Sequence, residues 1–262
     1  MKLTFYKYQG TGNDFVMIDN RDQKISKNNT KLVGRLCDRK FGIGADGLIL
    51  LEDSEDPEDD FKMVYFNADG NESSMCGNGG RCLVAFARFL GIIKDKARFT
   101  AIDGPHEAAL NDGIVSLKMQ DVKDISQNED FLFLDTGSPH HVIFAENIAT
   151  KDIKREGADI RYSDRYKNSG GTNVNFVEGI SDNAFSVRTY ERGVEDETLS
   201  CGTGVTAVAL AAYSSGKTNA ERVKLVTQGG ELFVDFKKTE NGFSDIWLSG
   251  PAEQVFKGEI IC

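Results

Sequence analysis

Apolar and polar residues alternate along most of this chain, in short stretches that turn residues such as Gly, Asn and Asp separate. A repeat of two positions is typical of a β-strand with one buried face. The pattern predicts strands at Leu3–Gln9, Asp14–Asn20, Gly47–Glu52, Phe61–Asn67, Ala97–Ile102, Ala108–Asn111, Ile114–Lys118, Phe131–Asp135, His141–Phe144, Asn173–Gly179, Ala184–Thr189, Arg222–Thr227, Glu231–Asp235 and Asp245–Ser249. We therefore expect strands to dominate the fold.

Four segments follow the helical repeat instead: Ser26–Cys37, Asn78–Leu90, Ile153–Asp159 and Thr203–Ser214. The second and the fourth are apolar on nearly every side, which is typical of a helix that is surrounded by core. The sequence thus predicts an α/β protein in which sheet encloses two central helices.

The chain also repeats itself at an offset of 125 residues. Four pairs of landmarks share this offset: Thr11–Gly12 with Thr136–Gly137, Cys76–Gly79 with Cys201–Gly204, Gly91 with Gly216, and Gly104 with Gly229. Gly91 and Gly216 stand where a left-handed helix C-cap is expected. Because several landmarks keep one offset, we interpret the chain as a duplicated domain with two similar α/β halves.

Composition and charge narrow the class of partner. Of the 262 residues, 40% are hydrophobic and 27% are charged, as in a folded globular protein. The net charge of −10 argues against a general nucleic-acid binder and against a protein bound to anionic membranes. No apolar stretch approaches the roughly 18 residues that cross a bilayer. We expect a cytoplasmic protein whose partner is a small molecule.

Five cysteines are spread through the chain, an odd number without the dense spacing of a disulfide scaffold. A zinc site needs closely spaced ligand pairs, and no such spacing occurs, so we expect free thiols and no metal. The only histidines are His106, His140 and His141, and the G-x-S-x-G motif of serine hydrolases is absent. Cysteine is therefore the reactive side chain to consider.

Cys76 and Cys201 occupy equivalent positions of the repeat, each between a loop and a glycine-rich helix start. The first N–H groups of a helix lack intrahelical partners and carry partial positive charge, so a thiolate placed there is stabilised and can act as a base near neutral pH. The same N–H groups can hold a carboxylate, because glycines let the backbone approach a ligand closely. Each half thus offers an acid/base thiol and an anion site.

A free cysteine is most often a small buried core residue. That interpretation suits Cys37 at a helix end, Cys82 inside an apolar helix, and Cys262 at the C-terminus. For Cys76 and Cys201, the repetition at two helix starts favours a function instead.

Two acid/base thiols suit one kind of chemistry. If the halves enclose a cleft, one thiolate removes a proton from one face of a carbon, the opposite thiol returns a proton to the other face, and the stereocentre inverts. Charge that develops on an α-carboxylate would meet the two helix starts. The lysine and phosphate context of a pyridoxal enzyme is not identifiable, so the sequence predicts racemisation or epimerisation without a cofactor.

Longer motifs extend this pattern along nearly the whole chain: Gly10–Phe15, Gly42–Gly47, Asn67–Gly70, Met75–Cys82, Gly137–His140, Asn173–Phe176, Tyr190–Gly193 and Glu197–Gly204. In these motifs the chain resembles the diaminopimelate epimerases, cofactor-independent two-cysteine enzymes that interconvert LL- and meso-diaminopimelate for lysine and peptidoglycan synthesis. The resemblance implies that Cys76 and Cys201 are the base and the acid, and that they exchange roles with the direction of the reaction.

The resemblance also implies the remaining site residues. Backbone amides of two helix starts would bind the reacting carboxylate: Gly77, Asn78, Gly202 and Thr203. Side chains that would contact the substrate are Asn13, Asn67, Asn173, Glu191 and Arg192, with His140 in support. Amide groups both donate and accept, and a guanidinium grips a carboxylate bidentately, which suits a substrate with an amino-acid group at each end. Turn capping by Asn13 and Asn67, and a surface ion pair of Arg192, are the alternatives.

Three features depart from the family pattern. Gly47 stands where many relatives have Gln, and Ser138 stands where many have Asn. The loop Glu191–Thr198 is one residue longer than the usual form. These departures concern the lining of the site, because both cysteines are retained.

The fold that the resemblance implies has two pseudo-symmetric domains, each a curved, mainly antiparallel sheet around a central helix. We expect residues 1–120 to form the N-terminal half, with 251–262 returning to it, and 121–250 to form the C-terminal half. A homodimer is also implied.

Rival functions stay open at this point. Proline or hydroxyproline racemases and phenazine-type isomerases belong to the same fold; the racemases keep two cysteines, so Asn67, Asn173 and Arg192 are the discriminating set. A thiol-redox protein or a binding protein without turnover predicts Cys76–Cys201 disulfide cycling, or ligand binding, with no proton exchange.

Overall fold

The computed structural model describes residues 2–73 and 75–262. The chain divides into two compact units: the part up to Leu117 together with Gly250–Cys262, and Lys118–Ser249. In the described part of the chain, no helix is both long enough and apolar enough to cross a membrane.

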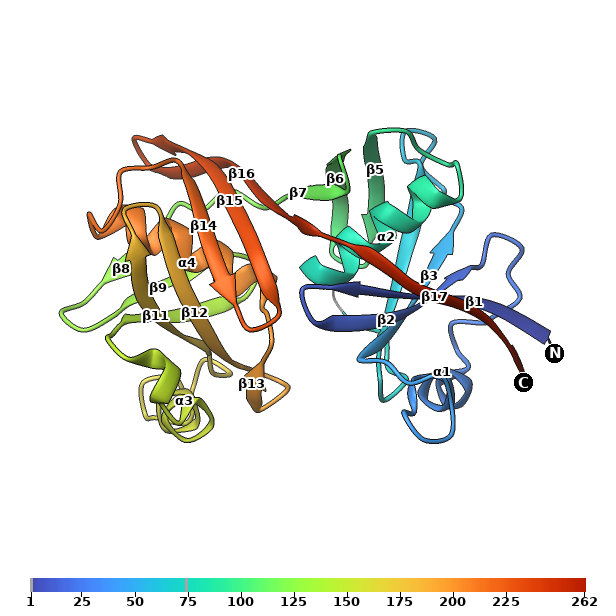
Figure 1. Ribbon diagram of the computed structural model, residues 1–262, viewed down its shortest axis with the longest axis horizontal. Coiled ribbons are helices and arrows are strands. Elements are labelled where there is room, and N and C mark those ends of the chain that lie inside the picture. The colour runs from blue at the N-terminus through green and yellow to red at the C-terminus, as the bar shows by residue number, and fades with distance from the viewer. Residues whose placement is uncertain (1, 74) are drawn as a thin grey trace. The chain divides into compact units, whose positions relative to one another are not determined.

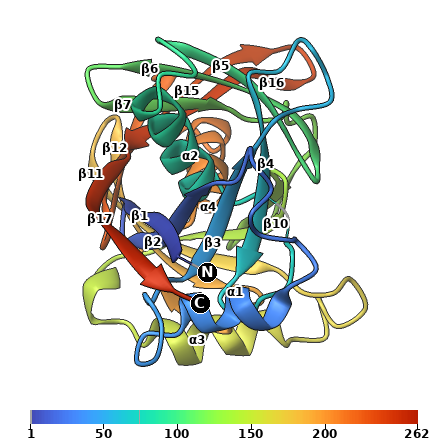
Figure 2. The ribbon, with the colours of Figure 1, turned by 90° about the vertical axis from the view of Figure 1, so that its right-hand side faces the viewer.

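The first unit is built from β1–β7, β17, α1 and α2 (Figure 1). Its strands are β1 (Lys2–Gly10), β2 (Asn13–Asp19), β3 (Gly47–Glu52), β4 (Phe61–Asn67), β5 (Lys96–Ala101), β6 (Gly104–Asn111), β7 (Ile114–Lys118) and β17 (Glu253–Ile261), and its helices are α1 (Thr30–Cys37) and α2 (Gly77–Phe89). β1 lies between β17 and β2 and is antiparallel to both, and Figure 2 shows β1 and β17 side by side. The order then continues with β2–β3 parallel, β3–β4 antiparallel, β4–β5 parallel, and β5–β6 and β6–β7 antiparallel.

The second unit repeats this succession. Its strands are β8 (Ile125–Gln127), β9 (Leu132–Asp135), β10 (Pro139–Phe144), β11 (Asn173–Ser181), β12 (Ala184–Glu191), β13 (Asp196–Thr198), β14 (Arg222–Thr227), β15 (Gly230–Thr239) and β16 (Gly242–Pro251), and its helices are η1 (Ile148–Thr150), α3 (Ile153–Arg161) and α4 (Gly202–Ser214). β9 pairs antiparallel with β8 and β10. β10 is then parallel to β11, β11 is antiparallel to β12, and β12 is parallel to β14. β15 pairs antiparallel with both β14 and β16. Strand for strand, this is the order of the first unit, so the predicted α/β class with two similar, mainly antiparallel domains is confirmed.

One helix occupies the centre of each unit. α2 packs against β1, β2, β3, β4, β6 and β17, and α4 packs against β9, β10, β11, β12, β14 and β15. Small side chains line α4, whose residues Val205–Ala212 are all buried, so the curved sheet can approach it from every side. The glycines that follow the two helices, Gly91 and Gly216, are left-handed (φ 74° and 72°), as predicted for C-caps.

The structure differs from the predicted elements in several respects. The first helix begins at Thr30 rather than Ser26, because the Asn29 side chain caps it by accepting a hydrogen bond from the Leu32 N–H (3.2 Å). β6 begins at Gly104 rather than Ala108, and the prediction lacked η1, β8, β13 and β17. β8 and β13 have only three residues each, and β17 has no periodic burial, since nearly all of its side chains are exposed.

Candidate active site

Cys76 lies at the N-cap of α2, in extended conformation (φ −94°, ψ 126°), and is half-buried. The first turn, Gly77–Gly80, is fully buried, and the N–H of Gly80 donates to the Cys76 carbonyl (2.7 Å). A Cβ at Gly79 would lie only 3.0 Å from Cδ1 of Ile49, so glycine lets the helix start approach β3 closely. The predicted position of this thiol, at a helix start, is confirmed.

Cys201 lies at the matching N-cap of α4 (φ −121°, ψ 113°) and is 7% exposed. Its Sγ atom is 3.5 Å from the Thr203 hydroxyl. A Cβ at Gly204 would lie 3.3 Å from this sulfur and 2.6 Å from Oδ1 of Asn175. Glycine is therefore required where the helix, the thiol and β11 meet.

Asn13 and Asn78 are joined directly. Nδ2 of Asn78 donates to Oδ1 of Asn13 (2.5 Å), and Nδ2 of Asn13 donates to Oδ2 of Asp46 (3.1 Å). Both bonds are tertiary, since Asn13 begins β2, Asn78 lies in the first turn of α2, and Asp46 precedes β3. The structure thus brings two of the predicted substrate-binding residues together beside a carboxylate.

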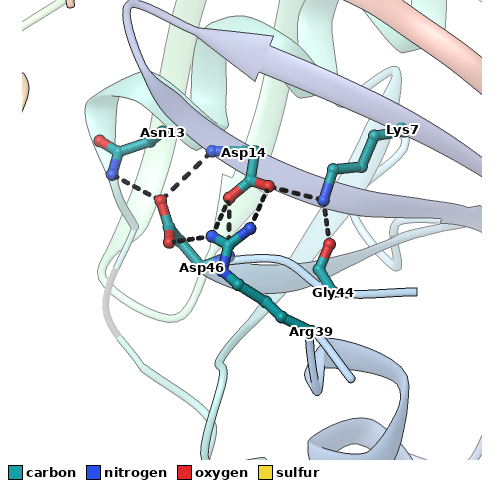
Figure 3. Close-up of polar contacts among 6 residues, drawn as sticks. All are labelled: Lys7, Asn13, Asp14, Arg39, Gly44 and Asp46. Carbon is teal, nitrogen blue, oxygen red and sulfur yellow. Dashed lines mark hydrogen bonds and ion pairs between the residues drawn. The ribbon is translucent and has the colours of Figure 1, made fainter. Parts of the chain in front are cut away.

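A network of charges supports this carboxylate (Figure 3). Arg39 donates to both oxygens of Asp14 (3.0 and 2.7 Å) and to Oδ1 of Asp46 (2.7 Å). The ammonium group of Lys7, 8% exposed, pairs with Asp14 at 2.7 Å and donates to the Gly44 carbonyl. Burial alone would raise the pKa of Asp14, but hydrogen bonds from Arg39 and Lys7 lower it to about 2. Two cations and two carboxylates therefore balance one another here.

Asn67 ends β4 opposite Gly47 of β3. Its exposed side chain has no hydrogen bond to the described residues, so it is open to a ligand. A Cβ at Gly47 would lie 2.6 Å from both the Phe66 carbonyl oxygen and the Tyr65 ring. The ring of Tyr65 thus lies where a side chain at position 47 would begin, which explains why this chain has glycine there.

His140 is fully buried and takes part in a directed chain of hydrogen bonds. Nδ2 of Asn175 is 3.1 Å from Nδ1 of His140, and Nε2 of His140 is 2.9 Å from Oγ1 of Thr203. The hydroxyl of Thr189 donates to Oδ1 of Asn175 (3.0 Å). Burial, and then the charge of Arg192, lower the pKa of His140 to about 3, so the ring is neutral at physiological pH.

Asn173 holds the loop that carries Arg192. Its Nδ2 donates to Oγ of Ser138 (2.9 Å) and to the Pro139 carbonyl (3.0 Å), while its Oδ1 accepts from the Arg192 N–H (2.8 Å). Nη2 of Arg192 also reaches Oγ of Ser138 (3.4 Å). Both hydrogens of the Asn173 amide are thus engaged within the unit, and the hydroxyl of Ser138 joins Asn173 to Arg192.

The loop after Glu191 is held in place by Glu195, a residue in left-handed conformation (φ 58°). The carboxylate of Glu195 accepts hydrogen bonds from three side chains and one backbone amide: Arg161 (3.1 Å), Tyr162 (2.7 Å), Tyr190 (3.0 Å) and the Gly193 N–H (3.0 Å). Burial raises the pKa of Glu195, but these bonds outweigh it and lower the pKa to about 2. Glu191 itself accepts from the Thr198 hydroxyl (2.9 Å) across this hairpin.

Comparison with known proteins places this chain in a family. The family model described as diaminopimelate epimerase matches residues 5–122 and 132–255. This chain belongs to the diaminopimelate epimerase family. It is 59% identical over 261 residues to the diaminopimelate epimerase of Flavobacterium psychrophilum, covering 99% of this chain and 100% of that protein. It is 44% identical to the enzyme of that name from Chlorobaculum tepidum, covering 96% and 98%.

Solved structures show the same fold at low sequence identity. A phenazine biosynthesis protein of the PhzF family from Bacillus anthracis superimposes with a TM-score of 0.80 at 13% identity, over 100% of both chains. A hydroxyproline epimerase from Agrobacterium vitis gives 0.70 at 13% identity, over 99% of this chain and 92% of that one. The fold is therefore shared beyond the diaminopimelate epimerase family.

Sequence reasoning missed several side chains that support the predicted ones: Arg39, Asp46, Arg81, Asn175, Thr189 and Glu195. Three of them stand inside motifs that the sequence displays: Asp46 in Gly42–Gly47, Arg81 in Met75–Cys82 and Asn175 in Asn173–Phe176. The spacing of two residues between Asn173 and Asn175 places both on one face of a strand, and this was the available signal.

Proposed function

We propose that this protein epimerises LL-diaminopimelate to meso-diaminopimelate by a two-base mechanism, with Cys76 and Cys201 as the acid/base pair. The observation that carries the proposal is the placement of each thiol at the N-cap of the central helix of its unit, in two units of the same strand order. Membership of the diaminopimelate epimerase family supports the substrate.

In the proposed reaction, the thiolate of one cysteine takes the α-proton and becomes a thiol. The electron pair left on the α-carbon is delocalised into the adjacent carboxylate. The thiol of the other cysteine then gives its proton to the opposite face and becomes the thiolate. The two cysteines end with exchanged protonation states, so the reverse reaction uses them in the opposite roles.

Charge on the reacting carboxylate needs preorganised donors. We assign this role to the backbone N–H groups at the two helix starts: Gly77, Asn78, Gly202 and Thr203. The partial positive charge of helix N-termini supports this assignment. Neutral His140, which bonds the Thr203 side chain, would orient the second of these starts without adding charge.

The side chains that we assign to substrate binding are Asn13, Asn67, Asn173, Glu191 and Arg192. Arg192 is suited to the carboxylate at the distal end, because a guanidinium binds carboxylates bidentately. Asn173 hydrogen-bonds to Ser138 and to the backbone of Arg192, which supports a role for Asn173 in orienting the Arg192 guanidinium.

We further propose that the reaction requires no cofactor, that the enzyme is cytoplasmic, and that it forms a homodimer. The edge of β17 supports the dimer, since β17 pairs with β1 and exposes Val255 (57%), Phe256 (46%) and Ile261 (82%). Light scattering on the purified protein tests the dimer directly.

Proton exchange in D2O tests the catalytic proposal. Reduced protein is mixed with LL-diaminopimelate, and NMR follows loss of the α-proton signal and appearance of the meso isomer. We expect inversion in the wild type and its loss in Cys76→Ala and in Cys201→Ala. Cys262→Ala, which removes an exposed thiol, is the matched control and should retain activity.

The same assay separates the rivals. Inversion of proline or hydroxyproline in place of diaminopimelate would overturn the substrate and leave the two-base chemistry. Ligand binding, or reversible Cys76–Cys201 oxidation, without any α-proton exchange would overturn the epimerase assignment.

A further inference from the structure

Arg81, in the second turn of α2, is fully buried. Its guanidinium donates to three neutral oxygens: Oγ1 of Thr11 (3.0 Å), Oδ1 of Asn78 (3.0 Å) and the Gly77 carbonyl (3.4 Å). Its Nε atom has no partner among the described residues. Within residues 2–73 and 75–262, no carboxylate forms an ion pair with this group.

The second unit builds the same helix turn without a cation. A buried charge without a counter-ion is costly. At the equivalent position of the second unit, 125 residues further on, stands Thr206. The Thr206 hydroxyl donates to the Gly202 carbonyl (2.9 Å), so a neutral side chain completes the same helix turn there.

What Arg81 does determine is the direction of the amide of Asn78. A guanidinium only donates, so the atom of Asn78 that faces it must be Oδ1. The Nδ2 atom of Asn78 is thereby turned to Oδ1 of Asn13, at 2.5 Å. Arg81 thus determines which end of the Asn78 side chain meets Asn13.

Asp46 orients the amide of Asn13, at the other end of the hydrogen-bonded Asn78–Asn13 pair. An ionised carboxylate only accepts, so the atom of Asn13 that faces Asp46 must be Nδ2. Asp46 is held in place by Arg39, which also binds Asp14 (Figure 3). A cation at one end and an anion at the other therefore orient both amides in the same sense.

We propose that Arg81 and Asp46 are positioning residues that fix the direction of the Asn78–Asn13 amide pair, so that Asn13 presents its second N–H to an oxygen of the substrate. The inference rests on the proposed function, because it takes Asn13 and Asn78 as substrate-binding residues. It adds that Asn13 faces an acceptor, such as a carboxylate oxygen, rather than an ammonium group.

A double-mutant cycle tests whether Asp46 acts through Asn13. Asp46→Asn keeps the shape of the side chain, removes its charge and lets it donate, so the direction of the Asn13 amide is lost. We expect kcat/KM to fall about 10-fold or more in Asp46→Asn and in Asn13→Ala. In the Asn13→Ala background, Asp46→Asn should then change kcat/KM less than about 2-fold.

A second cycle addresses Arg81 in the same way. Arg81→Met preserves volume and removes the donor, and its effect on kcat/KM should be largely lost in the Asn78→Ala background. Asp19→Asn is the matched control: Asp19 lies on β2 with Asn13, pairs with the exposed Arg21, and should leave kcat/KM unchanged. Thermal unfolding of each variant reports whether its fold is retained.

The outcomes are distinct. If the variants fold and the two single-mutant effects on kcat/KM multiply fully in both cycles, the inference is overturned. The two charges would then serve only the stability of the unit. If a variant fails to fold, the side-chain amide NMR signals of Asn13 and Asn78 in the wild type are measured instead. A downfield shift of the Asn13 amide proton that is bonded to Asp46 would support the inference, and an unshifted signal would refute it. A wild type without α-proton exchange would instead refute the proposed function.

Discussion

Asn175 determines the tautomer of His140. Its Nδ2 atom lies 3.2 Å from the His141 carbonyl, which only accepts, so this end of the amide is the donor. The same atom therefore donates to Nδ1 of His140 at 3.1 Å, and the proton of the neutral ring is on Nε2. Nε2 donates to the Thr203 hydroxyl, which lies 3.5 Å from Sγ of Cys201. A chain of neutral groups thus connects Asn175 with Cys201.

Replacing Asn175 by Asp reverses this chain. A carboxylate accepts a hydrogen bond from Nδ1–H of the ring and raises the pKa of His140 from its low value of about 3. We expect kcat/KM to fall about 10-fold or more and its pH profile to gain a histidine ionisation between about pH 5 and 8. Kinetics over that range measure both effects. The exposed Asn183→Asp is the control, and identical profiles for the two variants would contradict the tautomer assignment.

Gly204→Ala tests the close approach at the start of α4. The new Cβ would lie 2.6 Å from Oδ1 of Asn175, so Asn175 or the helix must move, and the histidine chain with it. We expect a loss of about 1–3 kcal/mol in the free energy of unfolding and a reduced kcat. Gly179→Ala on β11, where no atom lies within 4 Å of the added Cβ, should leave both unchanged. Equal effects at the two glycines would argue against a specific role of Gly204.

The stability of the protein should fall in mild acid through its buried histidines. Burial, and then the charge of Arg165, lower the pKa of His141 to about 4, and that of His140 is about 3, against 6.5 in the unfolded chain. Between pH 6.5 and 4 the unfolded state binds protons that the native state does not, so lowering the pH favours unfolding. Each histidine contributes at most about 1.4 kcal/mol per pH unit to the change of the free energy of unfolding with pH.

Denaturant unfolding of the wild type and of His141→Gln across this range measures the slope. As the pH falls, the free energy of unfolding of the variant should decrease less steeply than that of the wild type. The difference in slope should equal the contribution of one histidine. Asp14 and Glu195, whose pKa values of about 2 lie below their unfolded values of 3.8 and 4.5, add to the slope at the acid end of this range, but they do so equally in both proteins. A slope that is the same in both proteins would refute the assignment to His141.

Glu195→Gln should loosen the loop that carries Glu191 and Arg192. The carboxylate is ionised above about pH 2 and accepts from Arg161 and two tyrosines, whereas an amide oxygen accepts these bonds less strongly. We expect KM to rise about 10-fold with a smaller change in kcat. Glu156→Gln, which removes an ion pair with Lys151 in the same unit, is the control. An unchanged KM would show that the loop keeps its conformation without this charge.

Local sequence signals were sufficient for much of this protein. The duplication, the two central helices with their glycine C-caps, the N-cap positions of Cys76 and Cys201, and most strands were predicted, because caps and periodic burial depend on residues a few positions apart. The motifs also indicated the family. Elements without such a signal were missed, as with β17, which has no buried face and is held by its pairing with β1.

The direction of the polar side chains near the starts of α2 and α4 was decided only by tertiary structure. Asn13 meets Asp46, 33 residues away, and Asn78, 65 residues away, while His140 meets Asn175, 35 residues away. An amide or an imidazole can donate or accept, so its residue type alone does not determine its role. That role is set by neighbours that only donate or only accept, such as Arg81, Asp46 and the His141 carbonyl, and folding brings these neighbours into contact.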